Sequence, residues 1–259
     1  MNKLEDIKNQ LLINRGDSCC LFIGLDFDGT LAPIVSHPRL AKLSSPIKKA
    51  LKKLADRNGI KIAIVSGRSL GNLKTKIDLG RLIYAGNHGL EIAAQNKTWL
   101  HPKAKLAKNI IQELAEKLSW EIEDYSGAWV ENKNVSLSLH YRSVASKRAV
   151  KTLKRTVFKF LKPHKNKIMI LQGKKVFDIR PCVKWNKGDA LLKVARNACK
   201  KCRFIFIGDD VTDEEAFKTL KNKAVTVKVG FDGSTRARYR IKDHVQVQKL
   251  LELILKHAK

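Results

Sequence analysis

Residues 19–33 read CCLFIGLDFDGTLAP, an unbroken apolar run followed by two aspartates and a glycine. An apolar run without alternation is typical of a short parallel strand buried on both faces. Asp26 and Asp28 follow at the carboxyl end of this strand with one residue between them, so both side chains can point to the same cavity. Gly29 permits the tight turn that comes next. The segment therefore predicts the first strand of an open α/β sheet with its site at the strand ends.

The same rhythm of apolar strand, polar loop and amphipathic helix occurs on both sides of a different middle segment. Periodicity and capping residues predict these elements. The expected strands are 19–25, 61–65, 82–85, 203–207 and 224–229, and the expected helices are 45–55, 187–199, 213–220 and 246–257. Strands that alternate with helices predict βαβ units and hence a doubly wound parallel sheet.

The middle segment has another pattern. Helices are expected at 104–118 and 146–161, an alternating strand at 135–140, and two strands at 168–171 and 176–179 on either side of a Gln-Gly-Lys turn. Such a mixture predicts an α+β domain inserted into the α/β core. The expected division is a first core part at 1–101, an inserted domain at 102–181 and a second core part at 182–259.

Composition excludes several classes of protein. The 259 residues are 44% hydrophobic, which is ordinary for a globular chain and excludes a collagen, a disordered chain and a coiled coil. No apolar run approaches the roughly 18 residues that cross a bilayer. The first fourteen residues lack the compact apolar core of a secretory signal. We therefore expect a cytoplasmic, soluble protein that does not bind membranes.

The net charge of +28 is unusual and unevenly distributed. Residues 132–177 contain no acidic residue and thirteen lysines or arginines. One interpretation is a surface that binds polyanions, and the other is a solvated basic face. Aromatic residues are not interleaved with the basic ones, as stacking on nucleic acid would require, and lysine outnumbers arginine. The second interpretation is favoured, and nucleic acid is not an expected partner.

Five cysteines are an odd number and form no recognisable disulfide framework. Cys199 and Cys202 make a single CxxC pattern, whereas a structural zinc site needs four ligands. We expect plain reduced thiols.

The strongest chemical signal is a group of five aspartates. Asp26 and Asp28 follow one expected strand, and Asp209, Asp210 and Asp213 follow another. Carboxylates packed together repel and require a cation, and an all-oxygen ligand set suits magnesium. A metal beside a carboxylate nucleophile suits phosphoryl transfer, with one carboxylate attacking phosphorus and the other exchanging a proton.

Four motifs occur in the order of those in the haloacid dehalogenase superfamily of phosphatases: DFDGTLAP, SGR, the lysine of WNKG, and GDDVTDE. More narrowly, the chain resembles the trehalose-phosphatase family. That resemblance is carried by LDFDGTLAPI (25–34), YAGNHGLE (84–91), VENK (130–133), LHYR (139–142), DIRP (178–181), WNKG (185–188) and GDDVTDEEAF (208–217). It implies a hydrolase core with a cap as the inserted domain.

The resemblance also implies roles in the core. Asp26 would be the nucleophile, Asp28 the general acid and then base, and Ser66 and Lys187 would hold the transferring phosphoryl group. Magnesium would be held by the Asp26 carboxylate, the backbone carbonyl of Asp28 and Asp209, with Asp210 and Asp213 in support. Arg68 of the SGR motif is either a direct participant or a structural residue.

Other residues are matched to substrate binding. Glu131, Lys133, Arg142 and Asp178 correspond to family positions that hold sugar hydroxyl groups. The family usually has a glutamate at the position of Asp178. Further candidates are Thr30, His88 and Arg180, and for His88, Arg180 and the neighbouring His140 a purely structural role is the alternative.

The implied activity is magnesium-dependent hydrolysis of trehalose 6-phosphate to trehalose and phosphate through an aspartyl-phosphate. One alternative is a phosphatase of another sugar phosphate, such as sucrose or glucosylglycerol phosphate. A second is a basic protein that binds polyanions. The expected partner is a small sugar phosphate, the expected state is a monomer, and any trehalose-phosphate synthase would be a separate chain.

Overall fold

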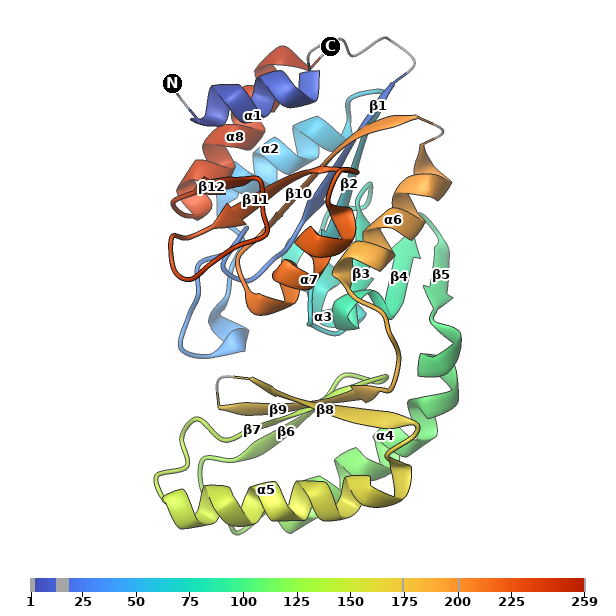
Figure 1. The fold of residues 1–259 in the computed structure, drawn as a ribbon, viewed down its shortest axis with the longest axis vertical. Helices are drawn as coiled ribbons and strands as arrows, with labels where there is room; N and C mark the ends of the chain where they lie inside the picture. The colour runs from blue at the N-terminus through green and yellow to red at the C-terminus, as the bar shows by residue number, and fades with distance from the viewer. Residues whose placement is uncertain (1–2, 13–18, 174, 200, 259) are drawn as a thin grey trace. The chain divides into compact units, whose positions relative to one another are not determined.

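The computed structural model describes residues 3–12, 19–173, 175–199 and 201–258. The chain divides into two compact units, Met1–Trp99 with Trp185–Lys259, and Leu100–Lys184 (Figure 1). The second unit is thus an insertion into the first, as the predicted fold class requires. Among the described helices, none combines the length and apolarity needed to cross a bilayer.

Within the described residues, the first unit is built on an eight-stranded sheet in the order β12-β11-β10-β1-β2-β3-β4-β5. The strands from β12 to β3 are parallel, and β4 is antiparallel to β3. The bounds are β1 Cys20–Leu25, β2 Ile60–Val65, β3 Ile83–Gly86, β4 Glu91–Ala94, β5 Lys97–Leu100, β10 Cys202–Gly208, β11 Val225–Val229 and β12 Tyr239–Ile241. The predicted parallel sheet is confirmed, with an antiparallel edge.

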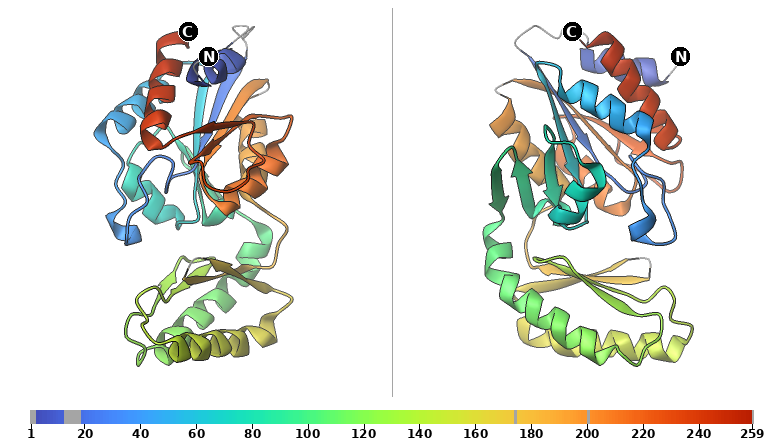
Figure 2. Two further views of the ribbon diagram at one scale, coloured as in Figure 1. Left: turned by 60° about the vertical axis from the view of Figure 1, so that its left-hand side comes forward. Right: turned by 180° about the vertical axis from the view of Figure 1, so that it is seen from behind.

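Helices cover both faces of this sheet (Figure 2). Their bounds are α1 Lys3–Leu12, α2 Ser45–Ala55, α3 Leu70–Ile77, α6 Lys187–Ala198, α7 Val211–Leu220 and α8 His244–His257, with short 3-10 helices η1 Pro38–Leu40 and η2 Asn87–Gly89. Leu21 and Ile23 of β1 belong to the core under α1, α2 and α8. Phe22 belongs to the opposite core under α6 and α7. Burial on both faces explains why the strand sequence is apolar without alternation.

The second unit has a four-stranded antiparallel sheet in the order β6-β7-β9-β8. Its strands are β6 Trp129–Asn132, β7 Leu137–His140, β8 Ile168–Gly173 and β9 Val176–Pro181, and its helices are α4 Pro102–Glu121, α5 Lys147–Leu161 and η3 Lys162–His164. The predicted hairpin is present, although Lys174 of its turn lies outside the described residues. The basic residues of α5 are mostly exposed, while Leu153, Val157 and Leu161 pack into the core of the unit.

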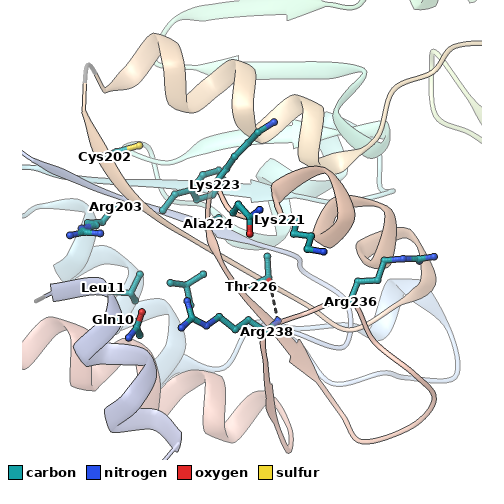
Figure 3. A pocket seen from close by; sticks show the side chains of 13 residues that line it. Gln10, Leu11, Cys202, Arg203, Lys221, Lys223, Ala224, Thr226, Arg236 and Arg238 are labelled. Atoms are coloured by element: carbon teal, nitrogen blue, oxygen red, sulfur yellow. Dashed lines mark hydrogen bonds between the residues drawn. The ribbon is translucent and has the colours of Figure 1, made fainter.

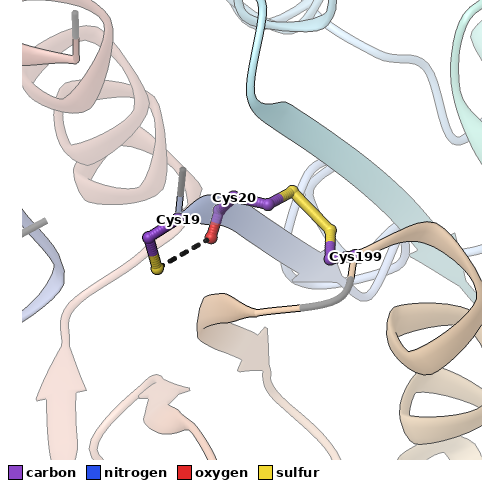
Figure 4. Close-up of a disulfide and its surroundings, with 3 residues drawn as sticks. All are labelled: Cys19, Cys20 and Cys199. Atoms are coloured by element: carbon purple, nitrogen blue, oxygen red, sulfur yellow. Dashed lines mark hydrogen bonds between the residues drawn. A yellow bond between two sulfur atoms is a disulfide. The ribbon is translucent and has the colours of Figure 1, made fainter. Parts of the chain in front are cut away.

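One prediction about the cysteines is wrong. Cys20, the first residue of β1, is disulfide-bonded to Cys199, which follows α6, with their Cα atoms 6.0 Å apart (Figure 4). The parallel pairing of β1 with β10 places Cys20 beside Cys202, and α6 ends just before β10 begins. The fold thus brings Cys199 next to a cysteine 179 residues away in sequence. Sequence spacing alone carries no signal of such a pair.

Candidate active site

The polar loops that follow the central strands meet at one edge of the sheet. Leu25 pairs with Ile207 of β10 on one side and with Ile64 of β2 on the other. Asp26 therefore lies between the loop that contains Asp209 and the loop that contains Ser66. This arrangement follows directly from parallel register, because the carboxyl ends of parallel strands lie at the same edge.

Lys187 is the centre of the carboxylate group. It is the first residue of α6 and is only 2% exposed. Its Nζ donates to Asp26 Oδ1 at 2.7 Å and to Asp213 Oδ1 at 2.9 Å, and it lies 3.8 Å from Asp210 Oδ1. One ammonium group thus lies beside three carboxylates that come from two different loops. The sequence analysis expected the aspartates to gather here, but not these contacts of Lys187.

Burial and mutual repulsion dominate the electrostatics of the site. Burial alone would lower the pKa of Lys187, but attraction by the surrounding carboxylates outweighs it and holds the pKa of this ammonium well above its usual value. Burial raises the pKa of Asp26 well above its usual value, against the attraction of Lys187, and the neighbouring aspartates add to the rise. For the same two reasons the pKa of Asp209 is raised to about 7. The site therefore holds more carboxylates than one lysine can neutralise.

The helix α7 holds two of the aspartates by a capping box. Asp210 is its N-cap, and the Oδ1 of Asp210 accepts from the backbone N of Asp213 at 3.0 Å. Asp213 Oδ2 accepts in return from the backbone N of Asp209 and Asp210 at 2.9 and 3.1 Å. Despite burial, the attraction of Lys187 and the hydrogen bonds that the Asp210 carboxylate accepts from Thr212 and Asp213 keep the pKa of Asp210 below its usual range. With Lys187 on its other oxygen, Asp213 is an anchor for the loop and for the lysine.

The residues fit a divalent cation. Carboxylate oxygens of Asp26, Asp209 and Asp213 lie within 4.8 Å of one another. Asp209 Oδ1 is buried, and no described residue forms a hydrogen bond with it. Gly29 has φ +80, and a Cβ there would lie 2.0 Å from Asp209 Oδ2, so only glycine allows this carboxylate its position. A crowded set of hard oxygen ligands with one orphaned oxygen suits magnesium.

Asp28 is held separately from this cluster. Arg68 donates from Nε to Asp28 Oδ2 at 2.7 Å and from Nη2 to Asp28 Oδ1 at 2.6 Å, a bidentate pair. The guanidinium also donates to the backbone O of Pro38 and to Asn72 Oδ1, at 2.8 and 3.0 Å. The structure thus places Arg68 in direct contact with the predicted acid–base residue, and the Asp28 carboxylate is engaged outside the metal cluster.

The SGR and GNHG loops are tied together. Ser66 is 2% exposed, and its backbone O accepts from the backbone N of His88 at 2.9 Å. His88 has a left-handed backbone, with φ 56, and a Cβ on Gly67 would lie 2.7 Å from its imidazole. Backbone of this kind is costly for a non-glycine residue and concentrates at functional sites. Thr30 is fully buried, and its hydroxyl has no hydrogen-bond partner among the described residues.

The second unit holds its own polar cluster on adjacent strands. Asp178 Oδ1 accepts from Ser138 Oγ at 2.7 Å and lies 3.4 Å from Lys133 Nζ. Glu131 Oε2 lies 3.0 Å from His140 Nε2, and the ring of Trp129 stacks on His140 with centroids 4.0 Å apart.

The structure therefore pairs Lys133 with Asp178 and Glu131 with His140. Three of these four are predicted sugar-binding residues, and His140 is the neighbouring residue named with them. Arg180 is half-buried on β9, two residues beyond Asp178, and Arg142 is exposed after β7. Both lie in the second unit, outside the two pairs.

Lys228 is a site residue that the sequence reasoning missed. Its side chain is 10% exposed, its Nζ donates to the backbone O of Asp209, and its Nζ lies 3.9 Å from Glu214 Oε1. The available signal was a lysine between two valines in the strand 225–229.

A parallel α/β core with an inserted α+β unit, and with aspartates and a lysine at the strand ends, defines the haloacid dehalogenase-like class of hydrolase folds. A hydrolase of this class from Bacteroides thetaiotaomicron superimposes with a TM-score of 0.62 at 16% identity, covering 91% of this chain and 99% of that one. The C-terminal domain of C. albicans trehalose-6-phosphate phosphatase superimposes with a TM-score of 0.78 at 22% identity, covering 99% and 97%.

The chain belongs to the trehalose-phosphatase family, whose family model matches residues 24–246. It is 33% identical over 271 residues to the probable trehalose-phosphate phosphatase E of Arabidopsis thaliana, which covers 98% of this chain and 74% of the relative. The resemblance inferred from the motifs is confirmed.

Proposed function

We propose that this protein is a magnesium-dependent phosphatase that hydrolyses trehalose 6-phosphate to trehalose and inorganic phosphate. The observation that carries the proposal is the buried contact of Lys187 with Asp26 and Asp213 beside the orphaned oxygen of Asp209. A carboxylate nucleophile, a fixed ammonium and a cation site are the parts that phosphoryl transfer needs. Membership of the trehalose-phosphatase family indicates that the sugar phosphate is trehalose 6-phosphate.

The reaction would proceed in two steps. An oxygen of Asp26 attacks phosphorus, the bond from phosphorus to the sugar oxygen breaks, and Asp28 gives that oxygen its proton. In the second step Asp28 takes a proton from water, the water oxygen attacks the aspartyl-phosphate, and Asp26 and phosphate are released. Ser66 and Lys187 would donate hydrogen bonds to the transferring group. Magnesium, held by the Asp26 and Asp209 carboxylates and the Asp28 carbonyl, would supply charge neutralisation.

The ion pair with Arg68 gives Asp28 a defined resting position. Both carboxylate oxygens of Asp28 accept a hydrogen bond from the guanidinium, which fixes the plane of the carboxyl group. Each oxygen keeps a second lone pair, and the side chain is 42% exposed, so a proton can be exchanged there while the pair is intact. Arg68 would act through Asp28, by orienting it.

The segment 102–181 would act as the cap that selects the sugar. Glu131, Lys133 and Asp178 are charged groups already paired with polar neighbours on one small sheet. Sugar hydroxyl groups would exchange for these partners, and a substrate without hydroxyl groups would leave them as they are. Arg142, Arg180, His88 and Thr30 are the further substrate-binding residues of the proposal.

We further propose that the protein acts as a monomer in the cytoplasm, on a substrate made by a trehalose-phosphate synthase.

The test is phosphate release from a panel of sugar phosphates, with trehalose, sucrose and glucosylglycerol phosphates and p-nitrophenyl phosphate. Trehalose 6-phosphate should have the highest kcat/KM, excess EDTA should abolish turnover, and Asp26→Asn should retain less than about one per cent of it. Preference for another sugar phosphate would overturn the substrate assignment. Turnover by Asp26→Asn near the wild-type rate would overturn the mechanism.

The cap is tested by Glu131→Ala and Lys133→Ala. Each should lower kcat/KM for trehalose 6-phosphate by roughly a hundredfold, the scale of a hydrogen bond to a charged group, with little change for p-nitrophenyl phosphate. An equal loss on both substrates would assign these residues to folding of the second unit.

A further inference from the structure

A hollow lies in the first unit, and none of the aspartates of the proposed active site lines it. It has a volume of about 510 Å³ and is bounded by α1, the start of β10, the turn between α7 and β11, and the segment before β12 (Figure 3). A hollow of this size is within the range of small-molecule sites.

The lining is strongly basic and contains no acidic residue. Five of its side chains are cationic: Arg203, Lys221, Lys223, Arg236 and Arg238. Within the described part of the chain, no carboxylate forms an ion pair with four of them, Lys221, Lys223, Arg236 and Arg238. Lysines elsewhere in the same unit do have carboxylate partners, as Lys48 has Asp78 at 3.3 Å. Like charges gathered around one hollow repel each other, and an anion there would relieve that repulsion.

The backbone that carries these cations is fixed. The backbone N of Arg238 donates to the hydroxyl of Thr226, which is 4% exposed, at 3.0 Å. Glu214 accepts from the backbone N of Arg236 at 2.7 Å and from Thr235 Oγ1 at 2.6 Å. Glu214 therefore anchors the main chain of this segment. The main chain at Arg236 and Arg238 is therefore ordered before any ligand binds, while the cationic side chains themselves are exposed.

The lining also includes apolar side chains, which form what is here called the apolar floor: Ala224 and Val225, which are half-buried, and Phe204, which is 5% exposed. A ligand that combines several negative charges with an uncharged organic body would match both parts of the lining.

This hollow is separate from the proposed active site. It lies at the start of β10, where Cys202 and Arg203 are found, whereas Asp209 follows the last residue of the same strand. At about 3.3 Å per residue, the two ends of this strand are on the order of 20 Å apart.

We propose that this hollow is a binding site for a small organic polyphosphate of nucleotide size. Its phosphate groups would be held by Lys221, Lys223, Arg236, Arg238 and Arg203, and its organic body would contact Ala224, Val225 and Phe204. The proposal does not depend on the proposed enzymatic activity.

The experiment measures ATP binding by equilibrium dialysis at 0.1 M salt with EDTA present, so that no metal-dependent turnover consumes the probe. The test variant is Lys223→Gln/Arg238→Gln. The matched control is Lys151→Gln/Arg155→Gln on the exposed face of α5, which removes the same two charges from the second unit. Neither variant touches the aspartate cluster, and thermal unfolding checks that both remain folded.

The test variant should bind ATP at least about tenfold more weakly than wild type, and the affinity of the control variant for ATP should differ from that of wild type by less than about twofold. Equal weakening in both variants would mean diffuse attraction to a cationic protein and would overturn the site. Tripolyphosphate alone should bind more weakly than ATP, since it cannot contact the apolar floor. Equal affinity for the two probes would overturn the assignment to an organic ligand.

Discussion

Lys187 offers the most direct test of the buried cluster, because one substitution removes its central positive charge. Lys187→Met keeps a side chain of similar length while it leaves Asp26, Asp210 and Asp213 without their shared ammonium. Removing one partner of a buried ion pair destabilises a protein by about 3–5 kcal/mol, since the remaining charge stays buried and unpaired. At about 2–4 °C per kcal/mol for a domain of this size, unfolding should occur roughly 6–20 °C lower.

The assay is thermal unfolding followed by circular dichroism at neutral pH in metal-free buffer. The matched control is Lys48→Met, because Lys48 pairs with a single carboxylate, Asp78, and both side chains are largely exposed at 40% and 83%. Exposed pairs of this kind contribute less than about 1 kcal/mol, so the unfolding temperature of the control should lie within about 4 °C of that of wild type.

A second readout separates charge from packing. Millimolar magnesium should raise the unfolding temperature of Lys187→Met by more than that of wild type, because the variant has more uncompensated negative charge to neutralise. If Lys187→Met unfolded within about 2 °C of wild type without metal, the cluster would not be held together by this lysine and the electrostatic reasoning would fail.

Two further predictions concern other parts of the first unit. Arg68→Ala should lower kcat for the sugar phosphate by about 10- to 100-fold, because Asp28 loses its bidentate partner, and added guanidinium chloride should restore part of the lost kcat. The control Arg81→Ala, at an exposed arginine, should leave kcat unchanged. If guanidinium did not restore activity to Arg68→Ala, a positioning role for Arg68 would be rejected. Burial raises the pKa of Tyr84 above 10.0, and its hydroxyl donates to the backbone O of Leu79 at 2.7 Å. Because the folded-state pKa is the higher one, this contribution to stability is complete below pH 10.0 and is lost as pH rises through the folded-state value. Tyr84→Phe should therefore flatten the alkaline decrease in urea-unfolding stability between pH 9 and about 11, and an unchanged slope would contradict this.

Local sequence determined most of the first unit and the identity of its chemical groups. The unbroken apolar run before Asp26 could only be stable between two layers of helix, and β1 lies between those layers. Parallel register then brings the ends of β1, β2 and β10 to one edge, so motifs far apart in sequence predicted one site. Weakly patterned elements escaped this reasoning: α3, β5 and β12 have only 8, 4 and 3 residues, too few for a periodic pattern to identify them.

Only tertiary structure decided which groups touch. The contacts of Arg68 with Asp28, of Lys228 with the Asp209 carbonyl and of Cys20 with Cys199 join residues from different elements of the unit. Periodicity describes one element at a time, and such contacts depend on how several elements pack together. The physical reason is that a buried charge without a partner is unfavourable, so each buried charged group pairs with an oppositely charged or polar group that the packed fold places beside it.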